Sequence, residues 1–325
     1  MRRITKELGL KLYEKMVLNR KYEERIYYLF LEGAVPGTVH QSHGQEACAV
    51  GVCANLRNSD YIASTHRPAG HSLAKGVSLN SMMCEMFAKS NGCCGAYGGA
   101  MHTGDMSVGA IPAVAIVGGG MPIAAGVGLS MKMQKTDNVV ACFFGDGASN
   151  EGAFHETMNA AATWKLPVIF VCENNLYGAS TRFNKVSVHE DVAKRADAYG
   201  MSSAIVDGND VIAVYEAAGK AVKRAREGKG PTLLELKTYR IGGHSRNDAC
   251  GYRSKDEAKA WLEKEPIRRM RKYMTDNKLA TDAELDAIDK KIENDIEKSI
   301  EIAKASPSPK PEDALRHVYY EGGAK

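Results

Sequence analysis

The chain has 325 residues, of which 44% are hydrophobic and 25% are charged, an ordinary composition for a globular protein. Its 43 Lys and Arg residues against 39 Asp and Glu residues give a formal net charge of +4, so the charge gives no case for a nucleic-acid-binding protein. The sequence has no apolar run of about 18 residues that predicts a membrane helix, and its N-terminus has no signal-peptide core. We therefore expect a soluble, cytoplasmic protein.

The first expected element is a long N-terminal helix. Apolar residues recur at helical spacing over residues 5–32, and Gly33 follows them. The next region, residues 36–120, is rich in Gly, His and Ser and contains short helical patterns at 44–55 and 78–89. Four of its histidines lie close together, but no Cys or acidic residue shares a regular spacing with them, so we do not predict a structural zinc site. These histidines are His40, His43, His66 and His71.

From residue 138 onward, apolar strands alternate with helices. Residues 138–144 and 167–172 are continuous apolar runs, which are typical of strands buried on both faces. The remaining expected elements are strands at 202–206 and 232–236 and helices at 149–163, 189–199 and 210–227. This alternation predicts an α/β fold with a doubly wound, mainly parallel sheet.

The C-terminal region is charged and helical. Residues 281–304 begin with a capping box, Thr281-x-x-Glu284, and carry one apolar stripe. The stripe fits either a surface helix that packs on its own chain or a helix that binds a partner. Because no boundary separates a second domain, we expect a single domain over 1–325, with an N-terminal helix within 1–35 and a helical extension at 254–325.

Polar residues follow two of the expected strands. Gly145-Asp146-Gly147 ends the first strand, and Asn174-Asn175 ends the second. Ligands of open parallel sheets bind at the carboxyl ends of the strands, where these residues would be side by side. A carboxylate and an amide oxygen are ligands that Mg²⁺ prefers, and glycines let a phosphate approach the backbone. Gly-Asp-Gly alone is equally compatible with a tight turn, but the pair of motifs predicts a site for a metal-bound diphosphate.

The longer segment around these motifs resembles the alpha subunit of the two-subunit 2-oxoacid and acetoin dehydrogenases, which bind thiamine diphosphate. That segment, residues 145–178, is GDGASNEGAFHETMNAAATWKLPVIFVCENNLYG. The resemblance extends in order over about residues 5–270. Its other motifs are HQSHGQEACAVGV (40–52), STHRPAGH (64–71), GGAMH (98–102), IVGGGMPIAAG (116–126) and TYRIGGHS (238–245).

The resemblance implies the fold of the thiamine-diphosphate-binding type and a set of site residues. The implied Mg²⁺ ligands are Asp146, Asn175 and the main-chain carbonyl of Tyr177. These three residues also belong to the implied cofactor site, whose other members are His66, Arg67, Ala115, Val117, Gly145, Gly147, Ala148 and His244.

Several of these residues have an implied role. Arg67 would contact a phosphate, which its guanidinium suits because it can donate two parallel hydrogen bonds. Ala115 and Val117 would lie along the aminopyrimidine, His244 would move protons beside the thiazolium, and His40 would lie near the substrate carbonyl. Each role has a structural alternative: the two histidines could be ordinary loop residues, and Arg67 could pair with a carboxylate. We interpret two further histidines as structural, namely His102 and His155.

The sequence departs from the family pattern around the expected substrate pocket. His66-Arg67 stands where the pyruvate enzymes have Tyr-Arg, and Pro68-Ala69 replaces the usual Gly-His. Val114-Ala115 replaces Asn-Gly, Thr38 replaces an aromatic residue, and Gln41-Ser42-His43 is more polar than expected. None of these changes touches the expected metal ligands, so they leave the cofactor prediction intact and the substrate open.

The resemblance implies an activity that needs a partner. The chain offers no second α/β domain to supply the glutamate that activates the aminopyrimidine, which in the family comes from a beta subunit in an α2β2 assembly. We predict acetoin cleavage to a hydroxyethyl unit on the cofactor, with transfer of the acetyl unit to a lipoyl group on an acyltransferase; pyruvate or a branched-chain 2-oxoacid is the alternative. Ser245 occupies a position that is phosphorylated in some relatives.

Two rival functions fit the sequence less well. A nicotinamide-dependent dehydrogenase would need the pattern G-x-G-x-x-G, but Ile123 stands where counting from Gly118 requires the last glycine. A degenerate regulatory subunit is opposed by the intact site residues, although the altered pocket keeps that hypothesis open; these residues are Asp146, Asn175, Arg67 and His244.

Overall fold

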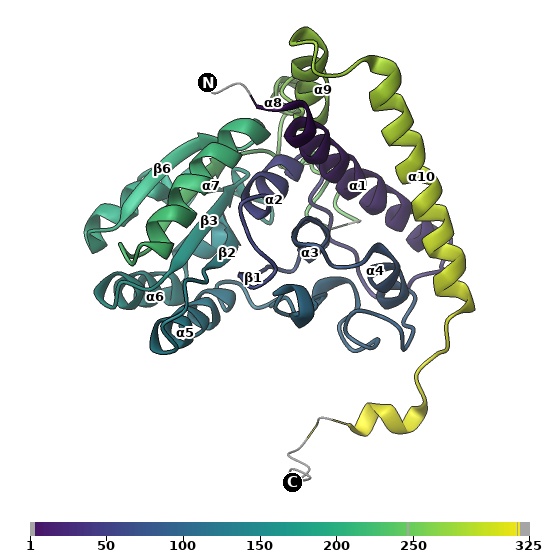
Figure 1. Ribbon diagram of the computed structural model, residues 1–325, viewed down its shortest axis with the longest axis horizontal. Coiled ribbons are helices and arrows are strands. Elements are labelled where there is room, and N and C mark those ends of the chain that lie inside the picture. The colour runs from purple at the N-terminus through teal and green to yellow at the C-terminus, as the bar shows by residue number, and fades with distance from the viewer. Residues whose placement is uncertain (1–3, 246, 317, 319–325) are drawn as a thin grey trace.

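The computed structural model describes residues 4–245, 247–316 and 318, and its centre is a five-stranded sheet (Figure 1). The spatial order is β1-β2-β3-β7-β6, and every neighbouring pair in this order is parallel. The strands are β1 (Tyr61–Ala63), β2 (Val140–Gly145), β3 (Val168–Asn174), β6 (Ser202–Asp207) and β7 (Thr232–Lys237). The order reverses after β3, because the chain crosses to β6 at the edge and returns to β7 beside β3.

Helices cover both faces of this sheet, as the doubly wound arrangement requires. On one face, α5 (Gly120–Met133) and α6 (Gly152–Thr163) form a core with Phe144 and Phe170. On the other face, α2 (Glu46–Cys53) and α7 (Val211–Arg226) form a second core, which contains the neighbouring residues of the same strands. Successive residues of a strand point to opposite faces, so burial on both faces explains the continuous apolar runs.

The expected strands and most expected helices are present, with ends that differ by up to three residues, but two helical predictions need correction. Residues 189–199 are not an α-helix, because this region contains a 3₁₀ helix, η5 (Val192–Tyr199). The N–H of Ala193 donates to the buried carboxylate of Glu235 at 2.7 Å, and Arg195 is tethered to the carbonyl of Ser149, so side-chain contacts override the helical periodicity.

The helix expected at 149–163 also begins later. Residues Asp146–Asn150 form a 3₁₀ turn, η3, directly after β2. Glu151 is extended, with φ −76° and ψ 146°, and α6 begins at Gly152. The chain therefore wraps around the end of β2 before the helix starts, which places the backbone of η3 at the edge of the sheet.

Short elements join the main layers. These are α3 (Pro68–Lys75), α4 (Leu79–Met86), η1 (Gly99–Met101), η2 (Met106–Val108), η4 (Phe183–Lys185) and the hairpin of β4 (Tyr177–Gly178) and β5 (Thr181–Arg182). Glu85, at the end of α4, orders the glycine-rich loop that follows, because its carboxylate accepts from four backbone N–H groups at 2.8–3.0 Å. The donors are Cys94, Ala96, Gly98 and Gly99.

The two ends of the chain pack together outside the sheet. In Figure 1, α10 (Asp282–Ala305) runs alongside α1 (Lys6–Leu31). Ion pairs such as Lys21–Glu293 join the two helices, and the predicted capping box of Thr281 and Glu284 is present. The apolar stripe of α10 is buried within this chain, so it is not a free partner-binding face.

The extension predicted at 254–325 is helical over most of its described part, and residues 317 and 319–325 lie outside the described residues. Its further elements are α8 (Lys255–Leu262), α9 (Pro266–Asp276) and the short η6 (Pro311–Leu315). None of the helices in the described ranges has both the length and the apolar character needed to cross a lipid bilayer.

Candidate active site

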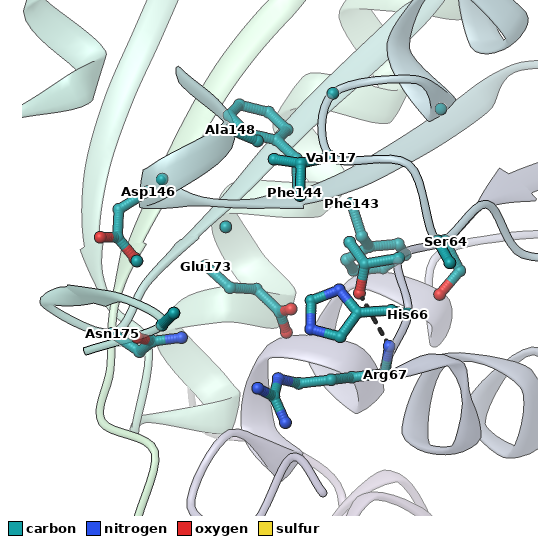
Figure 2. A pocket seen from close by; sticks show the side chains of 18 of the residues that line it. Ser64, His66, Arg67, Val117, Phe143, Phe144, Asp146, Ala148, Glu173 and Asn175 are labelled. Atoms are coloured by element: carbon teal, nitrogen blue, oxygen red, sulfur yellow. Dashed lines mark hydrogen bonds between the residues drawn. The ribbon is translucent and has the colours of Figure 1, made fainter. Parts of the chain in front are cut away.

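The carboxyl ends of four neighbouring strands meet around one cavity of about 390 Å³. The segments that follow β1, β2, β3 and β7 all contribute to its lining, and Figure 2 shows residues from the first three. The cavity therefore lies at the edge of the sheet where ligands of doubly wound folds bind.

Every residue that the sequence assigns to the cofactor lines this cavity. The set is His66, Arg67, Ala115, Val117, Gly145, Asp146, Gly147, Ala148, Asn175, Tyr177 and His244. The ring of His40, which is not itself a lining residue, lies 5.1 Å from that of His66 and 5.3 Å from that of His244. The two histidines interpreted as structural make other contacts, His102 to the carbonyl of Ala113 and His155 to the hydroxyl of Tyr199.

Asp146 is the most isolated polar group of the site. Its side chain is 1% exposed, and neither carboxylate oxygen has a hydrogen-bond partner among the described residues. Burial raises its pKa to about 6. The backbone N–H groups of Asp146 and Asn175 are near enough to lower the pKa in part, but neither forms a hydrogen bond with the carboxylate. A buried carboxylate without partners is costly unless a cation neutralises it, so Asp146 fits a metal ligand.

Asn175 reaches the same place from the next strand. In the register of β2 and β3, Gly145 lies opposite Glu173, so Asp146 and Asn175 both follow paired strand ends. The side-chain oxygen of Asn175 accepts from the N–H of Tyr177 at 3.3 Å, and its nitrogen donates to Gln45 Oε1 at 3.0 Å. Figure 2 shows Asp146 and Asn175 on the same side of the cavity.

The neighbouring Asn174 faces away and has a different task. Its nitrogen donates to the buried Glu235 Oε1 at 2.6 Å, and its oxygen accepts from the N–H of Leu176 at 3.1 Å. Leu176 has a φ of +74°, a left-handed conformation that an Asx-type hydrogen bond helps to hold. Asn174 thus shapes the turn that presents Asn175 and Tyr177 to the cavity.

Two glycines bring the backbone close to the cavity. A Cβ added to Gly147 would lie 3.1 Å from the Cα of Gly178, so a side chain there would push the β4 turn away from η3. A Cβ added to Gly145 would meet no protein atom within 4 Å and would take up space in the cavity itself. These positions leave room for a phosphate against the backbone.

Two arginines give the cavity positive charge. Arg67 is buried, donates to the carbonyls of Gln41 and His244, and has its pKa lowered to about 9 by burial and by Arg240. Arg240, also buried, donates to the carbonyl of Ala179 and the hydroxyl of Tyr252. Two guanidinium groups in one enclosed cavity strongly favour an anionic ligand.

Three histidines cluster beside these arginines. Burial together with Arg67 lowers the pKa of His66 to about 3 and that of His244 to about 4, so both rings are neutral at physiological pH. Nη2 of Arg67 lies 3.1 Å from Nδ1 of His244, and a guanidinium only donates, so Nδ1 is the acceptor and Nε2 carries the proton. His40 Nδ1 and His66 Nε2 are buried without a partner among the described residues.

Sequence reasoning did not assign several lining residues, among them Gln45, Ser64, Glu173 and Arg240. Ser64 and Glu173 both contact His71, which lies 2.7 Å from Ser64 Oγ through Nδ1 and 3.2 Å from Glu173 Oε1 through Nε2. Glu173 and Arg240 lie inside motifs that carried the resemblance, so a signal was available for them. Gln45 and Ser64 also lie inside such motifs, 40–52 and 64–71, but the contact of Gln45 with Asn175 depends on how α2 packs and cannot be read from the sequence.

The polar segment Gln41-Ser42-His43 is held by α1. Glu23 is buried and accepts from the N–H and the hydroxyl of Ser42 at 2.8 and 2.7 Å. The side chain of Gln41 donates to the carbonyl of Glu23 at 2.7 Å, and His43 lies 3.7 Å from the Glu23 carboxylate. The unusual polarity of this segment is therefore matched by a buried acid beneath it.

Comparison with known proteins decides the family. The family model described as the dehydrogenase E1 component matches residues 14–312 of this chain. The chain belongs to this family. It is 46% identical over 324 residues to the alpha subunit of acetoin:2,6-dichlorophenolindophenol oxidoreductase from Bacillus subtilis (strain 168). The match covers 98% of this chain and 96% of that protein.

Other relatives are alpha subunits of acetoin oxidoreductases or of pyruvate dehydrogenases. The acetoin:2,6-dichlorophenolindophenol oxidoreductase alpha subunit of Cupriavidus necator is 43% identical over 97% of this chain and 95% of that protein. The chloroplastic pyruvate dehydrogenase E1 component subunit alpha-3 of Arabidopsis thaliana is 42% identical over 97% of this chain and 75% of that protein. Membership of the E1 family implies thiamine diphosphate as the cofactor. The isolated Asp146 carboxylate, the open backbone at Gly145 and the two arginines fit a diphosphate held through a cation.

Proposed function

We propose that this chain is the alpha subunit of a dehydrogenase component that acts on acetoin with thiamine diphosphate, Mg²⁺ and a beta subunit, and passes the acetyl unit to a lipoyl group on an acyltransferase. The observation that carries this proposal is the buried, unpartnered Asp146 beside Asn175 in a cavity that also holds Arg67 and Arg240. The choice of acetoin is supported by the 46% identity to the acetoin oxidoreductase alpha subunit.

The residues at the strand ends would hold the cofactor's diphosphate. Asp146, the oxygen of Asn175 and the carbonyl of Tyr177 would supply three oxygen ligands to Mg²⁺, which takes six and completes its shell with phosphate and water. Arg67 would donate to the phosphate oxygens, and His66 would contact them through its unpartnered Nε2. The backbone of Gly145, Gly147 and Ala148 would line the diphosphate.

When bound, thiamine diphosphate supplies the carbon nucleophile and the electron sink for cleavage beside a carbonyl. His244 would present its Nε2–H to the reacting oxygen, because Arg67 occupies Nδ1 and the low pKa keeps the ring neutral. His40, whose ring lies 5.3 Å from that of His244, would contact the substrate carbonyl. Both rings would thus orient the substrate, and His244 would hold or move a proton at Nε2.

The part of the cavity that would hold the aminopyrimidine ring gives a reason to propose a partner subunit. The proposed aminopyrimidine wall contains Ala115 and Val117, and the neighbouring Ile116 is 77% exposed. Asp146 and Glu173 are the acidic residues of the described cavity lining, and Glu173 already contacts His71. We therefore propose that a beta subunit covers this wall and supplies the activating glutamate in an α2β2 assembly.

A substrate panel tests the proposal. The chain is co-expressed with a candidate beta subunit, and reduction of 2,6-dichlorophenolindophenol is followed with acetoin, pyruvate and branched-chain 2-oxoacids, each with thiamine diphosphate and Mg²⁺. We expect acetoin to give the highest kcat/KM and the chain alone to give no turnover. A preference for pyruvate would establish the alternative substrate, which the 42% identity to a pyruvate dehydrogenase alpha subunit favours. No turnover and no cofactor binding would favour a degenerate regulatory subunit.

A further inference from the structure

Gln45 is a buried lining residue for which the proposed reaction gives no role. It directly precedes α2 and is 2% exposed. Its backbone is fixed on both sides, because its N–H donates to Ser42 at 2.9 Å and its carbonyl accepts from Cys48 at 3.0 Å. Its side-chain oxygen accepts from the nitrogen of Asn175 at 3.0 Å, a contact between residues 130 positions apart.

This contact determines which way the Asn175 amide points. An amide has an acceptor at one end and a donor at the other, with nearly the same shape. The backbone N–H of Tyr177 only donates, so the atom of Asn175 that lies 3.3 Å from it must be the oxygen. The nitrogen then points to Gln45, which must present its oxygen in return.

In the absence of a cation, the opposite orientation of the Asn175 amide would compete with metal binding. Both oxygens of Asp146 are buried and unpartnered, so they would readily accept from an amide nitrogen turned toward them. Figure 2 shows the carboxylate of Asp146 directed toward Asn175, whose side-chain nitrogen points away from it. A flipped Asn175 would satisfy Asp146 and would present N–H groups, which cannot bind Mg²⁺, to the metal position.

We propose that Gln45 is a positioning residue for the metal site: it holds the nitrogen of Asn175, so that the oxygen of Asn175 and both oxygens of Asp146 stay available for Mg²⁺. This inference rests on the proposed function, because it concerns the cation that Asp146 and Asn175 would share. Gln45 acts through Asn175 and does not need to touch the metal.

Binding measurements on the full chain, co-expressed with its beta subunit, test this role. The variant Gln45→Met removes the acceptor but keeps the length, Gln45→Glu keeps an acceptor, and Gln134→Met makes the first change at an exposed glutamine that caps the end of α5. Binding of Mg²⁺ is measured by calorimetry with thiamine diphosphate present, and binding of Mn²⁺ by electron paramagnetic resonance. The melting temperature of each ligand-free complex reports folding.

We expect Gln45→Met to weaken Mg²⁺ binding by about 10- to 100-fold, the usual effect of losing a group that orients a metal ligand. Gln45→Glu is expected to stay within about threefold and Gln134→Met to match the wild type. At saturating Mg²⁺, the kcat of Gln45→Met should recover to within about twofold, because the variant changes metal affinity and leaves the reacting groups in place. Should Gln45→Met fail to fold, Gln45→Asn, whose acceptor is too short to reach, carries the same expectation.

A second background separates orientation from general packing. In Asn175→Asp the side chain has oxygens at both ends, so its orientation no longer matters. Adding Gln45→Met to Asn175→Asp should change Mg²⁺ affinity by less than about threefold, and this non-additivity is the signature of the proposed role. Equal Mg²⁺ affinity in the wild type and Gln45→Met, or the same loss in both backgrounds, would overturn the inference. If the wild type itself binds no Mg²⁺ with thiamine diphosphate, the proposed function fails.

Discussion

Arg67 and His244, 177 residues apart in sequence, are joined by two contacts from one guanidinium nitrogen. Nη2 of Arg67 donates to the carbonyl of His244 at 2.7 Å and lies 3.1 Å from its Nδ1. The segment between β1 and α3 is thereby fixed to the loop after β7. The same group that is proposed to bind phosphate also sets the position and the tautomer of the proposed proton-moving histidine.

Substitution of Arg67 should therefore change His244 as well as cofactor binding. In Arg67→Met the loss of a nearby positive charge should raise the pKa of His244 above about 4, because that charge disfavours the protonated ring. Arg67→Lys should keep the pKa low but lose the paired contacts, and kcat/KM should fall at least about tenfold, or about 1.4 kcal/mol. Nitrogen NMR of the histidine ring measures the pKa and the tautomer. An unchanged His244 pKa in Arg67→Met would contradict this coupling.

Removal of the Asp146 charge should stabilise the ligand-free protein. Burial raises the pKa of this carboxyl to about 6, so above that pH the folded protein carries a buried charge without a partner. We expect Asp146→Asn to raise the melting temperature of the ligand-free complex at pH 7.5 by a few degrees, consistent with a gain of about 1 kcal/mol. Differential scanning calorimetry in EDTA measures this change. A lower melting temperature would show that Asp146 is satisfied without a cation.

Glu23 should make stability depend on pH. Burial raises its pKa to about 7, and Glu46 adds to the shift, whereas the hydrogen bonds from Ser42 and the charge of Arg67 oppose it. A carboxyl whose pKa is higher in the folded than in the unfolded state loses stability as the pH rises from about 4.5 through about 7.

The matched variant Glu23→Gln cannot ionise. Relative to the wild type, it should gain up to about 3 kcal/mol between pH 4.5 and pH 8, with no further gain at higher pH. Urea unfolding at several pH values measures the difference. A difference that is constant over this range would mean that Glu23 ionises normally.

Glu235 should be among the most sensitive buried acids. Its fully buried carboxylate accepts from Asn174 at 2.6 Å and from Ala193 at 2.7 Å, and pairs with Lys237 at 2.6 Å. Glu235→Ala leaves these donors unpaired and should lower the free energy of unfolding by about 3 kcal/mol. The exposed Glu227 offers a control, and its change to Ala should leave the free energy of unfolding nearly unchanged. Urea unfolding at pH 7.5 compares them, and equal losses would refute the assigned importance of Glu235.

The arrangement of the strand ends could be predicted from the sequence, whereas several contacts around them could not. Buried apolar runs predict parallel strands, and parallel strands bring Asp146 and Asn175 to one edge, so local patterns suffice. Gln45 and Glu235 act on Asn175 and Asn174 from separate elements, and only the packing of α2 and β7 brings them there. Likewise, η5 has helical periodicity, and contacts with Glu235 and Ser149 determine its 3₁₀ form.

The most direct test of the proposed site is the dependence of thiamine diphosphate binding on a divalent cation. Calorimetric titration of the co-expressed complex should show tight binding with Mg²⁺ and at least about 100-fold weaker binding in EDTA, and Asp146→Ala should bind weakly under both conditions. Equal binding of thiamine diphosphate with Mg²⁺ and with EDTA, or an Asp146→Ala variant that binds as the wild type does, would contradict the proposal that Asp146 and Asn175 hold a metal-bound diphosphate.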